Sequence, residues 1–257
     1  MNLKEAKVLM FDLDGTIVQN GRFIDSLAID TLTRLKERGY KLCVNSGRPH
    51  FLNLKVLDPY GIEFIDVKKD EYELISYLDK DIIKEVSETF IDEPIAISIL
   101  TPKLVYMNKL IDKDFIERYK KSRQLDVEIV DFNTLDMTAP KLLGMIDKDG
   151  YLSIREKIKT INSDKYDLFF SNTHLLEIVP KDISKGKACS ILKERLKLSK
   201  NDIISFGDEE NDIPMFKESI GVAMGNANDH VKQYAQYETA DVTEDGIYYF
   251  FKKYDFI

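Results

Sequence analysis

The feature that most constrains the fold is a short apolar run, Val8-Leu9-Met10-Phe11, that ends abruptly in Asp12-Leu13-Asp14-Gly15-Thr16. An apolar run followed by charged residues and a glycine is typical of a buried parallel strand that emerges at its carboxyl end. In open α/β sheets, ligands bind at that edge. Two aspartates one residue apart repel each other when both are ionised, and burial favours the neutral form of each. The segment is therefore either a site that uses the pair or a plain acidic surface turn.

Two further apolar runs end in polar segments of the same kind. Tyr40–Val44 predicts a strand that leads into Asn45-Ser46-Gly47-Arg48-Pro49. Ile203–Phe206 predicts a strand that leads into Gly207-Asp208-Glu209-Glu210-Asn211-Asp212. Because the carboxyl ends of parallel strands meet at one edge of a sheet, the three polar segments are expected to face a common crevice. Taken singly, the serine–glycine–arginine segment is equally well explained as a strand-to-helix turn.

A helix is predicted to begin after Ser184, which is a suitable N-cap residue. Its first turn carries Lys185 and Lys187, although the amino end of a helix already has partial positive charge. An anion or an aspartate near these lysines would offset that charge. Exposure to solvent is the alternative explanation, and it fits Lys187 better than Lys185.

The predicted crevice gathers more negative than positive charge. Its aspartates are residues 12, 14, 208 and 212, and its local cations are Lys185 and Arg48. Such a cluster is difficult to keep ionised without a divalent metal ion. Oxygen ligands with few carboxylates suit Mg²⁺, which keeps several waters and shares phosphate oxygens with its substrate.

Composition excludes several classes of protein. The net charge of -8 and the pI near 5.1 argue against a nucleic-acid binder, which would carry a basic patch. Without a signal segment or a long apolar run, we expect no membrane association and a cytoplasmic location. Cys43 and Cys189 are interpreted as reduced core thiols, with a disulfide as the alternative. His50, His174 and His230 lack metal-ligand spacing.

The pattern of elements predicts an α/β fold in which a Rossmann-like, doubly wound parallel sheet forms the core and an α+β domain is inserted into it. Strands and helices alternate singly at both ends of the chain, whereas pairs of strands separate the helices in the middle. We assign residues 1–79 and 174–257 to the core domain and residues 80–173 to the insertion. The insertion includes a helix predicted over Asp112–Arg123. Oligomeric state is left open.

Four segments resemble the ordered motifs of the haloacid dehalogenase-like (HAD) phosphatases: Asp12-Leu13-Asp14-Gly15-Thr16, Ser46-Gly47-Arg48, Lys185-Gly186 and Gly207-Asp208-Glu209-Glu210-Asn211-Asp212. The place and size of the insertion resemble the Cof-type subclass IIB, whose α/β cap domain lies between the second and third motifs. The resemblance extends to Met224-Gly225-Asn226-Ala227.

The sequence departs from the family in one place. After Tyr60-Gly61-Ile62, relatives usually carry an Asn-Gly-Ala turn before the cap, but this chain continues to Asp66-Val67-Lys68-Lys69-Asp70. The departure concerns the edge of the cleft and hence the fit of the substrate.

The resemblance implies a Mg²⁺-dependent phosphatase that hydrolyses a small phosphomonoester, such as a sugar phosphate or a cofactor phosphate. Asp12 would be the nucleophile that forms an aspartyl-phosphate. Asp14 would be the general acid for the leaving oxygen and then the base that activates water.

The resemblance also implies roles for the other motif residues. Mg²⁺ would be held by Asp12, by the main-chain carbonyl of Asp14 and by Asp208. Asp212 and Glu209 would not bind the metal ion themselves but would lie next to the residues that do, and Asp212 would orient Lys185. The groups that bind phosphate or hold its loop would be Thr16, Ser46, Gly47, Arg48, Lys185 and Asn211.

Two alternatives remain open at this point. A phosphomutase of the phosphomannomutase type uses the same nucleophile and acid but returns the phosphoryl group to a sugar. A non-catalytic protein that binds a phosphorylated ligand has no use for the second aspartate, Asp14. In each case the expected partner is a small phosphorylated metabolite.

Overall fold

The computed structural model describes residues 3–19, 22–23, 26–48, 53, 57, 76–111, 116–117, 120 and 125–257. The chain forms two compact units, the first of Met1–Tyr72 with Ser184–Ile257 and the second of Glu73–Ile183. The second unit therefore interrupts the chain of the first. No helix in the described part of the chain has the length and apolar character needed to cross a membrane.

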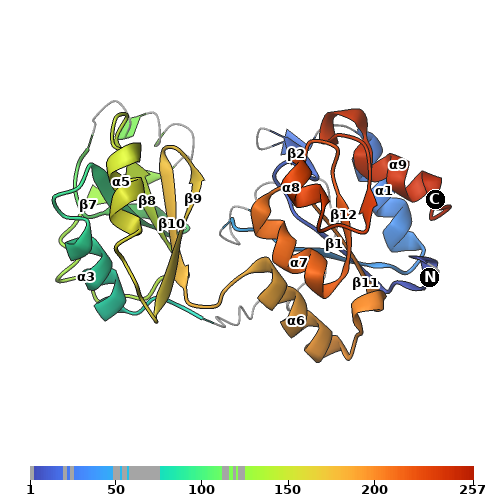
Figure 1. Ribbon diagram of the computed structural model, residues 1–257, viewed down its shortest axis with the longest axis horizontal. Helices are drawn as coiled ribbons and strands as arrows, with labels where there is room; N and C mark the ends of the chain where they lie inside the picture. The colour runs from blue at the N-terminus through green and yellow to red at the C-terminus, as the bar shows by residue number, and fades with distance from the viewer. Residues whose placement is uncertain are drawn as a thin grey trace. The chain divides into compact units, whose positions relative to one another are not determined.

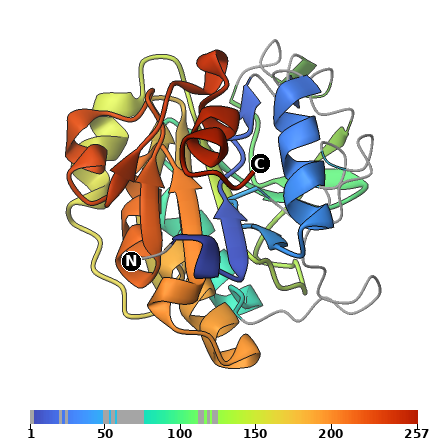
Figure 2. The same cartoon turned by 90° about the vertical axis from the view of Figure 1, so that its right-hand side faces the viewer.

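The first unit is built on a parallel sheet with the strand order β13-β12-β11-β1-β4 (Figure 2). Its strands are β1 (Val8–Phe11), β4 (Lys41–Val44), β11 (Ile203–Gly207), β12 (Ile220–Ala223) and β13 (Tyr237–Glu238). From β1 the chain adds β4 on one side, and it later adds β11, β12 and β13 on the other. The topological switch point therefore lies between β1 and β11. Open α/β sheets bind their ligands at the carboxyl ends of the strands that flank such a point.

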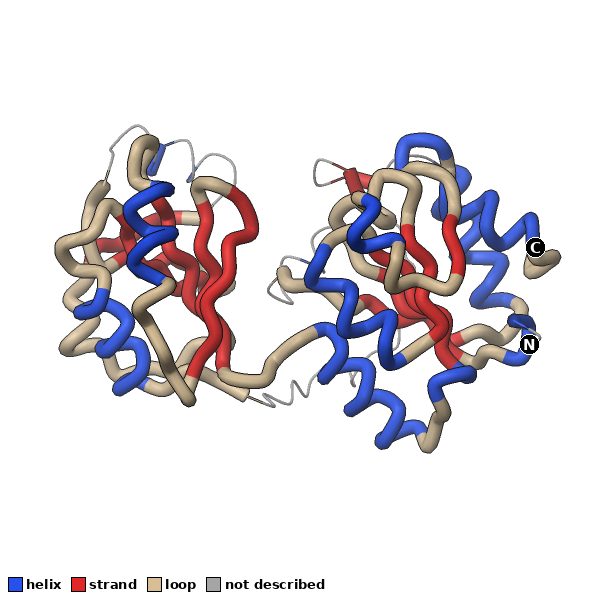
Figure 3. The backbone as a smooth tube through the Cα atoms, viewed as in Figure 1, coloured by secondary structure: helices blue, strands red, loops and turns tan. Residues whose placement is uncertain are grey.

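Helices cover both faces of this sheet (Figure 3). One face carries α1 (Ser26–Glu37) and α9 (Gly246–Lys253), and the other carries α6 (Lys185–Leu196), α7 (Ile213–Glu218) and α8 (Asp229–Lys232). Successive residues of β1 alternate between the two cores: Leu9 and Phe11 pack with α1 and α9, and Val8 and Met10 pack with α6 and α7. Burial on both faces explains why β1 is apolar throughout. The predicted fold class is confirmed.

Short elements complete the first unit. They are η1 (Leu3–Glu5), the antiparallel pair β2 (Val18–Gln19) and β3 (Arg22–Phe23), η3 (Lys200–Asp202), η4 (Glu210–Asp212) and η5 (Val242–Glu244). The β2–β3 hairpin was not predicted, because strands of two residues carry no detectable alternation.

The second unit holds a sheet of order β7-β6-β5-β8-β10-β9. Its elements are α3 (Lys80–Thr89), β5 (Ile95–Leu100), β6 (Leu104–Met107), β7 (Asp126–Ile129), β8 (Leu142–Ile146), α5 (Tyr151–Ile158), β9 (Tyr166–Asn172) and β10 (Leu175–Pro180). Apolar residues of α3 and α5 share one core with β5, β8 and β10. Figure 1 shows the helices and strands of this unit. Neighbouring strands are antiparallel except for β6 and β7, which run parallel.

The structure differs from the sequence interpretation at the end of the insertion. A boundary after residue 173 falls between β9 and β10, which form one hairpin, and β10 also pairs with β8. The chain returns to the first unit only at Ser184. An apolar strand has the same local pattern in either sheet, so sequence could not assign β10 to its partners. Most of the helix predicted over Asp112–Arg123, and the departure at residues 60–70, lie outside the described residues.

Both cysteines are free thiols on one face of the core sheet. Burial raises the pKa of Cys43 to about 12 and that of Cys189 to about 11. The prediction of reduced core thiols is confirmed. Phe250 and Phe251 of the aromatic C-terminal segment are core residues, whereas Tyr248 is only half-buried.

The aromatic cluster around Phe206 gives a test of the core. Phe206 is fully buried and stacks on Phe11 with ring centroids 5.1 Å apart, and Phe250 contacts it edge-on at 5.0 Å. We expect Phe206→Ala to lower the free energy of unfolding by about 3–5 kcal/mol, because it removes buried contacts and leaves a cavity. Urea unfolding followed by circular dichroism measures this loss. Tyr249 is an exposed aromatic residue of α9, the helix that carries Phe250, so Tyr249→Ala should change stability little. Equal losses of stability in the two variants would contradict this account.

Candidate active site

The candidate site is built on the two strands that flank the switch point. Phe11 of β1 pairs with Phe206 of β11. The backbone N–H of Asp12 then donates to the carbonyl of Phe206 at 3.0 Å. The ladder thus continues one residue beyond β1 and places Asp12 beside the start of the segment that holds Asp208. The ends of these two strands therefore lie side by side, as the sequence predicted.

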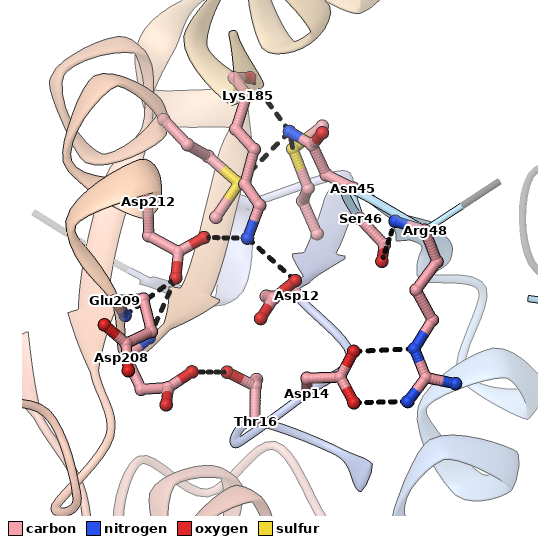
Figure 4. Close-up of polar contacts among 12 residues, drawn as sticks. Asp12, Asp14, Thr16, Asn45, Ser46, Arg48, Lys185, Asp208, Glu209 and Asp212 are labelled. Atoms are coloured by element: carbon pink, nitrogen blue, oxygen red, sulfur yellow. Dashed lines mark hydrogen bonds and ion pairs between the residues drawn. The ribbon is translucent and has the colours of Figure 1, made fainter. Parts of the chain in front are cut away.

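Lys185 is the central cation of the site (Figure 4). Its Nζ lies 2.7 Å from Asp12 Oδ1 and donates to Asp212 Oδ1 at 2.6 Å. The lysine is 8% exposed although it opens helix α6. Burial alone would lower the pKa of Lys185, but the carboxylates of Asp212 and Asp12 outweigh burial and raise it. The lysine predicted to need an anion therefore has two.

The start of α6 is fixed by two side chains. Ser184 is the N-cap, and its Oγ accepts a hydrogen bond from the backbone N–H of Lys187 at 3.1 Å. Asn45, which follows β4, donates from Nδ2 to the carbonyl of Lys185 at 2.9 Å. Asn45 is buried and was not among the predicted site residues. It connects the second polar segment to the helix that carries the lysine.

Asp212 is fully buried, and both of its carboxylate oxygens have partners. Oδ1 accepts from Lys185, and Oδ2 accepts from the backbone N–H groups of Asp208 and Glu209 at 2.9 and 3.1 Å. A Cβ atom at Gly207 would lie 2.3 Å from Cγ of Asp212, so only glycine leaves room for this carboxylate. Asp212 therefore orients Lys185 and closes the turn after β11.

Asp208 lies against the loop that follows β1. Its Oδ1 accepts from the hydroxyl of Thr16 at 3.2 Å. Gly15 has a positive φ of 78°, and a Cβ atom there would lie 2.1 Å from Oδ2 of Asp208. Both the backbone angle and the close approach require glycine at this position.

The electrostatics of the site indicate surplus negative charge. Carboxylate oxygens of Asp12, Asp208 and Asp212 lie within 4.8 Å of one another. Burial, more than any other effect, raises the pKa of Asp12 to about 6, against the lowering effect of Lys185. Burial together with Asp12, Asp212 and Glu209 raises the pKa of Asp208 to about 7. One ammonium does not neutralise three buried carboxylates, so the donor set fits a divalent cation with oxygen ligands.

Asp14 and Arg48 form a separate pair. The guanidinium of Arg48 donates from Nε to Asp14 Oδ2 at 2.6 Å and from Nη2 to Oδ1, which is a bidentate contact. The side chain of Asp14 is 54% exposed, in contrast to buried Asp12. Ser46 Oγ accepts from the backbone N–H of Arg48 at 3.1 Å. The family resemblance placed Arg48 among the groups that bind phosphate or hold its loop, and in the structure its partner is the carboxylate of Asp14.

The remaining predicted residues lie at the rim. Gly47, Glu209 and Asn211 are exposed, and Glu209 contributes its backbone N–H to Asp212. Asn226, in the segment that extended the family resemblance, contacts Asp208 at 3.0 Å and was not predicted as a site residue. Its only sequence signal was that resemblance.

The family model for haloacid dehalogenase-like hydrolases matches residues 9–251. The chain belongs to this family. The match spans all four motifs and the insertion between the second and the third. The resemblance inferred from the motifs is confirmed.

Curated relatives of the chain are phosphatases. A 5-amino-6-(5-phospho-D-ribitylamino)uracil phosphatase of Bacillus subtilis (strain 168) is 24% identical and is matched over 96% of this chain and 97% of its own length. An HMP-PP phosphatase of Escherichia coli O1:K1 is 26% identical over 86% of this chain and 85% of its own. The expected enzyme class, a phosphoric monoester hydrolase, is confirmed.

Among solved structures, a sugar phosphatase of HAD subclass IIB aligns with a TM-score of 0.77. It is 22% identical, and the alignment covers 98% of this chain and all of the other. This likeness shows a common fold, including the inserted domain.

Substitution of Gly15 tests the contact with Asp208. We expect Gly15→Ala to displace the Asp208 carboxylate and thereby to weaken the binding of Mg²⁺. The Mg²⁺ concentration that gives half of the full rise in unfolding temperature should then increase about tenfold or more. Thermal unfolding at increasing Mg²⁺ measures this shift. Gly39→Ala is the matched control, because Gly39 also has a positive φ but a Cβ atom there meets nothing within 4 Å. An equal shift in both variants would show that backbone strain, and not the carboxylate, is responsible.

Proposed function

We propose that the protein is a Mg²⁺-dependent phosphatase that hydrolyses a small phosphomonoester through an aspartyl-phosphate on Asp12. The observation that carries the proposal is the buried contact of Asp12 with Lys185, 2.7 Å from Oδ1 to Nζ, beside the carboxylate of Asp208. A carboxylate becomes a competent nucleophile toward a phosphate dianion when fixed positive charge neutralises the approach.

The reaction would proceed in two displacements. In the first, a carboxylate oxygen of Asp12 forms a bond to phosphorus, the bond from phosphorus to the ester oxygen breaks, and Asp14 gives its proton to that oxygen. In the second, Asp14 takes a proton from water, the water oxygen attacks phosphorus, and the bond to Asp12 breaks to release phosphate. Lys185 would stabilise charge on the transferring group in both steps.

Asp12 and Asp208 would hold the Mg²⁺, with the main-chain carbonyl of Asp14 as a further ligand. Asp212 is a poorer candidate, because its oxygens are already engaged by Lys185 and two backbone N–H groups. When bound, the cation would offset the surplus charge of the carboxylates and of the phosphate.

The exposed pair of Asp14 and Arg48 supports separate roles for the two aspartates of the first motif. Asp12 is buried against Lys185, whereas Asp14 lies where a leaving group and water can reach it. Arg48 would orient the Asp14 carboxylate, and phosphate is an alternative partner for the same guanidinium fork. Ser46 and Asn211 would contact the phosphoryl group. The names of the curated relatives support a small phosphorylated metabolite as substrate.

Replacement of the nucleophile tests the reaction. We expect the wild type to release phosphate from a generic aryl phosphate only when Mg²⁺ is present. Asp12→Asn should reduce this release at least about a thousandfold, because the amide cannot attack phosphorus. Asp30→Asn, at an exposed aspartate of helix α1, is the matched control and should keep full activity.

The outcomes separate the rival functions. Turnover that survives Asp12→Asn would contradict the mechanism. A Mg²⁺-dependent phosphoenzyme without hydrolysis would favour a mutase, and the absence of both turnover and phosphoenzyme would favour a binding protein.

Replacement of the proposed acid and base makes a different prediction. Asp14→Asn should slow hydrolysis of the intermediate more than its formation from an activated aryl ester, since a good leaving group needs no proton. Acid quenching with a radiolabelled phosphodonor should then show labelled protein that wild type does not accumulate. If the phosphoenzyme of Asp14→Asn were hydrolysed as fast as that of the wild type, Asp14 would be excluded as the base.

A further inference from the structure

The side chain of Asn226 connects three segments of the first unit. It lies in the loop after β12, and its Nδ2 donates to the carbonyl of Gly15 at 2.9 Å and to Oδ2 of Asp208 at 3.0 Å. Its Oδ1 accepts from the backbone N–H of Val242 at 3.0 Å. One amide thus joins the loop after β1, the segment after β11 and the helix η5.

We infer that Asn226 is a positioning residue for the cation site, whose amide holds the Asp208 carboxylate in the orientation that binds Mg²⁺. The inference rests on the proposed function, because it takes Mg²⁺ as the cation. It adds a residue from outside the four motifs to the machinery of the site.

The identity of the partners fixes how the amide is oriented. A carbonyl and a carboxylate can only accept hydrogen bonds, so the nitrogen of Asn226 must face Gly15 and Asp208. Its oxygen faces the N–H of Val242. The atom that could ligate a metal is therefore directed to the backbone, and the group beside Asp208 is a donor. Asn226 acts on the cation through Asp208.

Asp208 is restrained on three sides. Thr16 donates to Oδ1, Asn226 donates to Oδ2, and the backbone of Gly15 lies close to Oδ2. Each carboxylate oxygen keeps a further lone pair, and carboxylate oxygens of Asp12 and Asp212 lie within 4.8 Å. Without the Asn226 donor, Oδ2 loses its fixed direction, and the carboxylate can rotate away from the position it shares with Asp12.

The contact with Gly15 adds a second effect. Gly15 follows Asp14, whose carbonyl is a proposed Mg²⁺ ligand. Asn226 holds the next carbonyl along the chain, so the same amide restrains this loop and Asp208 relative to each other. Groups behind metal ligands typically change metal affinity by about 10- to 100-fold when removed.

The chain offers a matched control two residues away. Asn228 is also an exposed asparagine in the loop after β12, and its Oδ1 caps helix α8 by accepting from Val231 N at 3.0 Å. Asn228→Ala removes an amide of the same size and costs about 1 kcal/mol of stability as a lost cap. Because Asn226 is exposed, Asn226→Ala leaves no core cavity, and Asn226→Ser serves as a second variant with a smaller deletion.

The experiment is isothermal titration of the full-length protein with MgCl₂ in the absence of substrate, with thermal unfolding in EDTA as a check of the fold. We expect Asn226→Ala and Asn226→Ser to raise the Kd for Mg²⁺ about tenfold, whereas Asn228→Ala stays within about twofold of wild type. At saturating Mg²⁺ the Asn226 variants should regain most of their kcat.

Other outcomes overturn the inference. An unchanged Mg²⁺ affinity in Asn226→Ala would make Asn226 a purely structural tie, and an equal loss in Asn228→Ala would assign the effect to the loop as a whole. If the wild type itself bound no Mg²⁺, the proposed function would fail, and that result is distinct from a failure of Asn226 alone.

Discussion

The site depends on one buried ammonium group held between two carboxylates. Lys185 contacts Asp12 and Asp212, all three are almost fully buried, and Asp208 lies beside them. Breaking a buried ion pair by removing one partner typically costs about 3–5 kcal/mol, because an uncompensated charge remains. The geometry of the strand ends around Lys185 is therefore restrained by electrostatics as well as by packing. One ammonium group does not balance the carboxylates of Asp12, Asp208 and Asp212, so negative charge is in excess. This excess is the physical basis for a cation site.

Packing of the core sets the distance between the charged groups. Phe11 and Phe206 pair across β1 and β11 and stack their rings, and the next residues along the two strands are Asp12 and Gly207. Strand pairing thus brings together two parts of the site that are far apart in sequence. The glycines then determine what fits, because Gly207 makes room for Asp212 and Gly15 for Asp208.

The sequence predicted what depends on local pattern. It predicted the three strand ends and the helix that begins after Ser184, because these depend on short segments of the chain. It expected an anion or an aspartate near Lys185, and the family resemblance implied that Asp212 orients this lysine. It did not predict that Arg48 pairs with Asp14, or that Asn45 and Asn226 tie the segments together. These contacts span 34 residues or more and arise only from the order of strands. The assignment of β10 to the second sheet was missed because an apolar strand has the same local pattern in either sheet.

The two aspartates of the first motif show how adjacent positions acquire different chemistry. Leu13 between them is fully buried in the core, so the chain turns around a fixed point. Asp12 then faces the lysine at the amino end of α6, and Asp14 faces the arginine that follows β4. Each carboxylate has its own cation, and the two cations come from different segments of the chain. The two carboxylates are thereby held by different partners, so the surroundings of each are set separately. A fold that places β1 in the interior of a parallel sheet brings the segments after two neighbouring strands, β4 and β11, to the end of β1, which an edge position could not do.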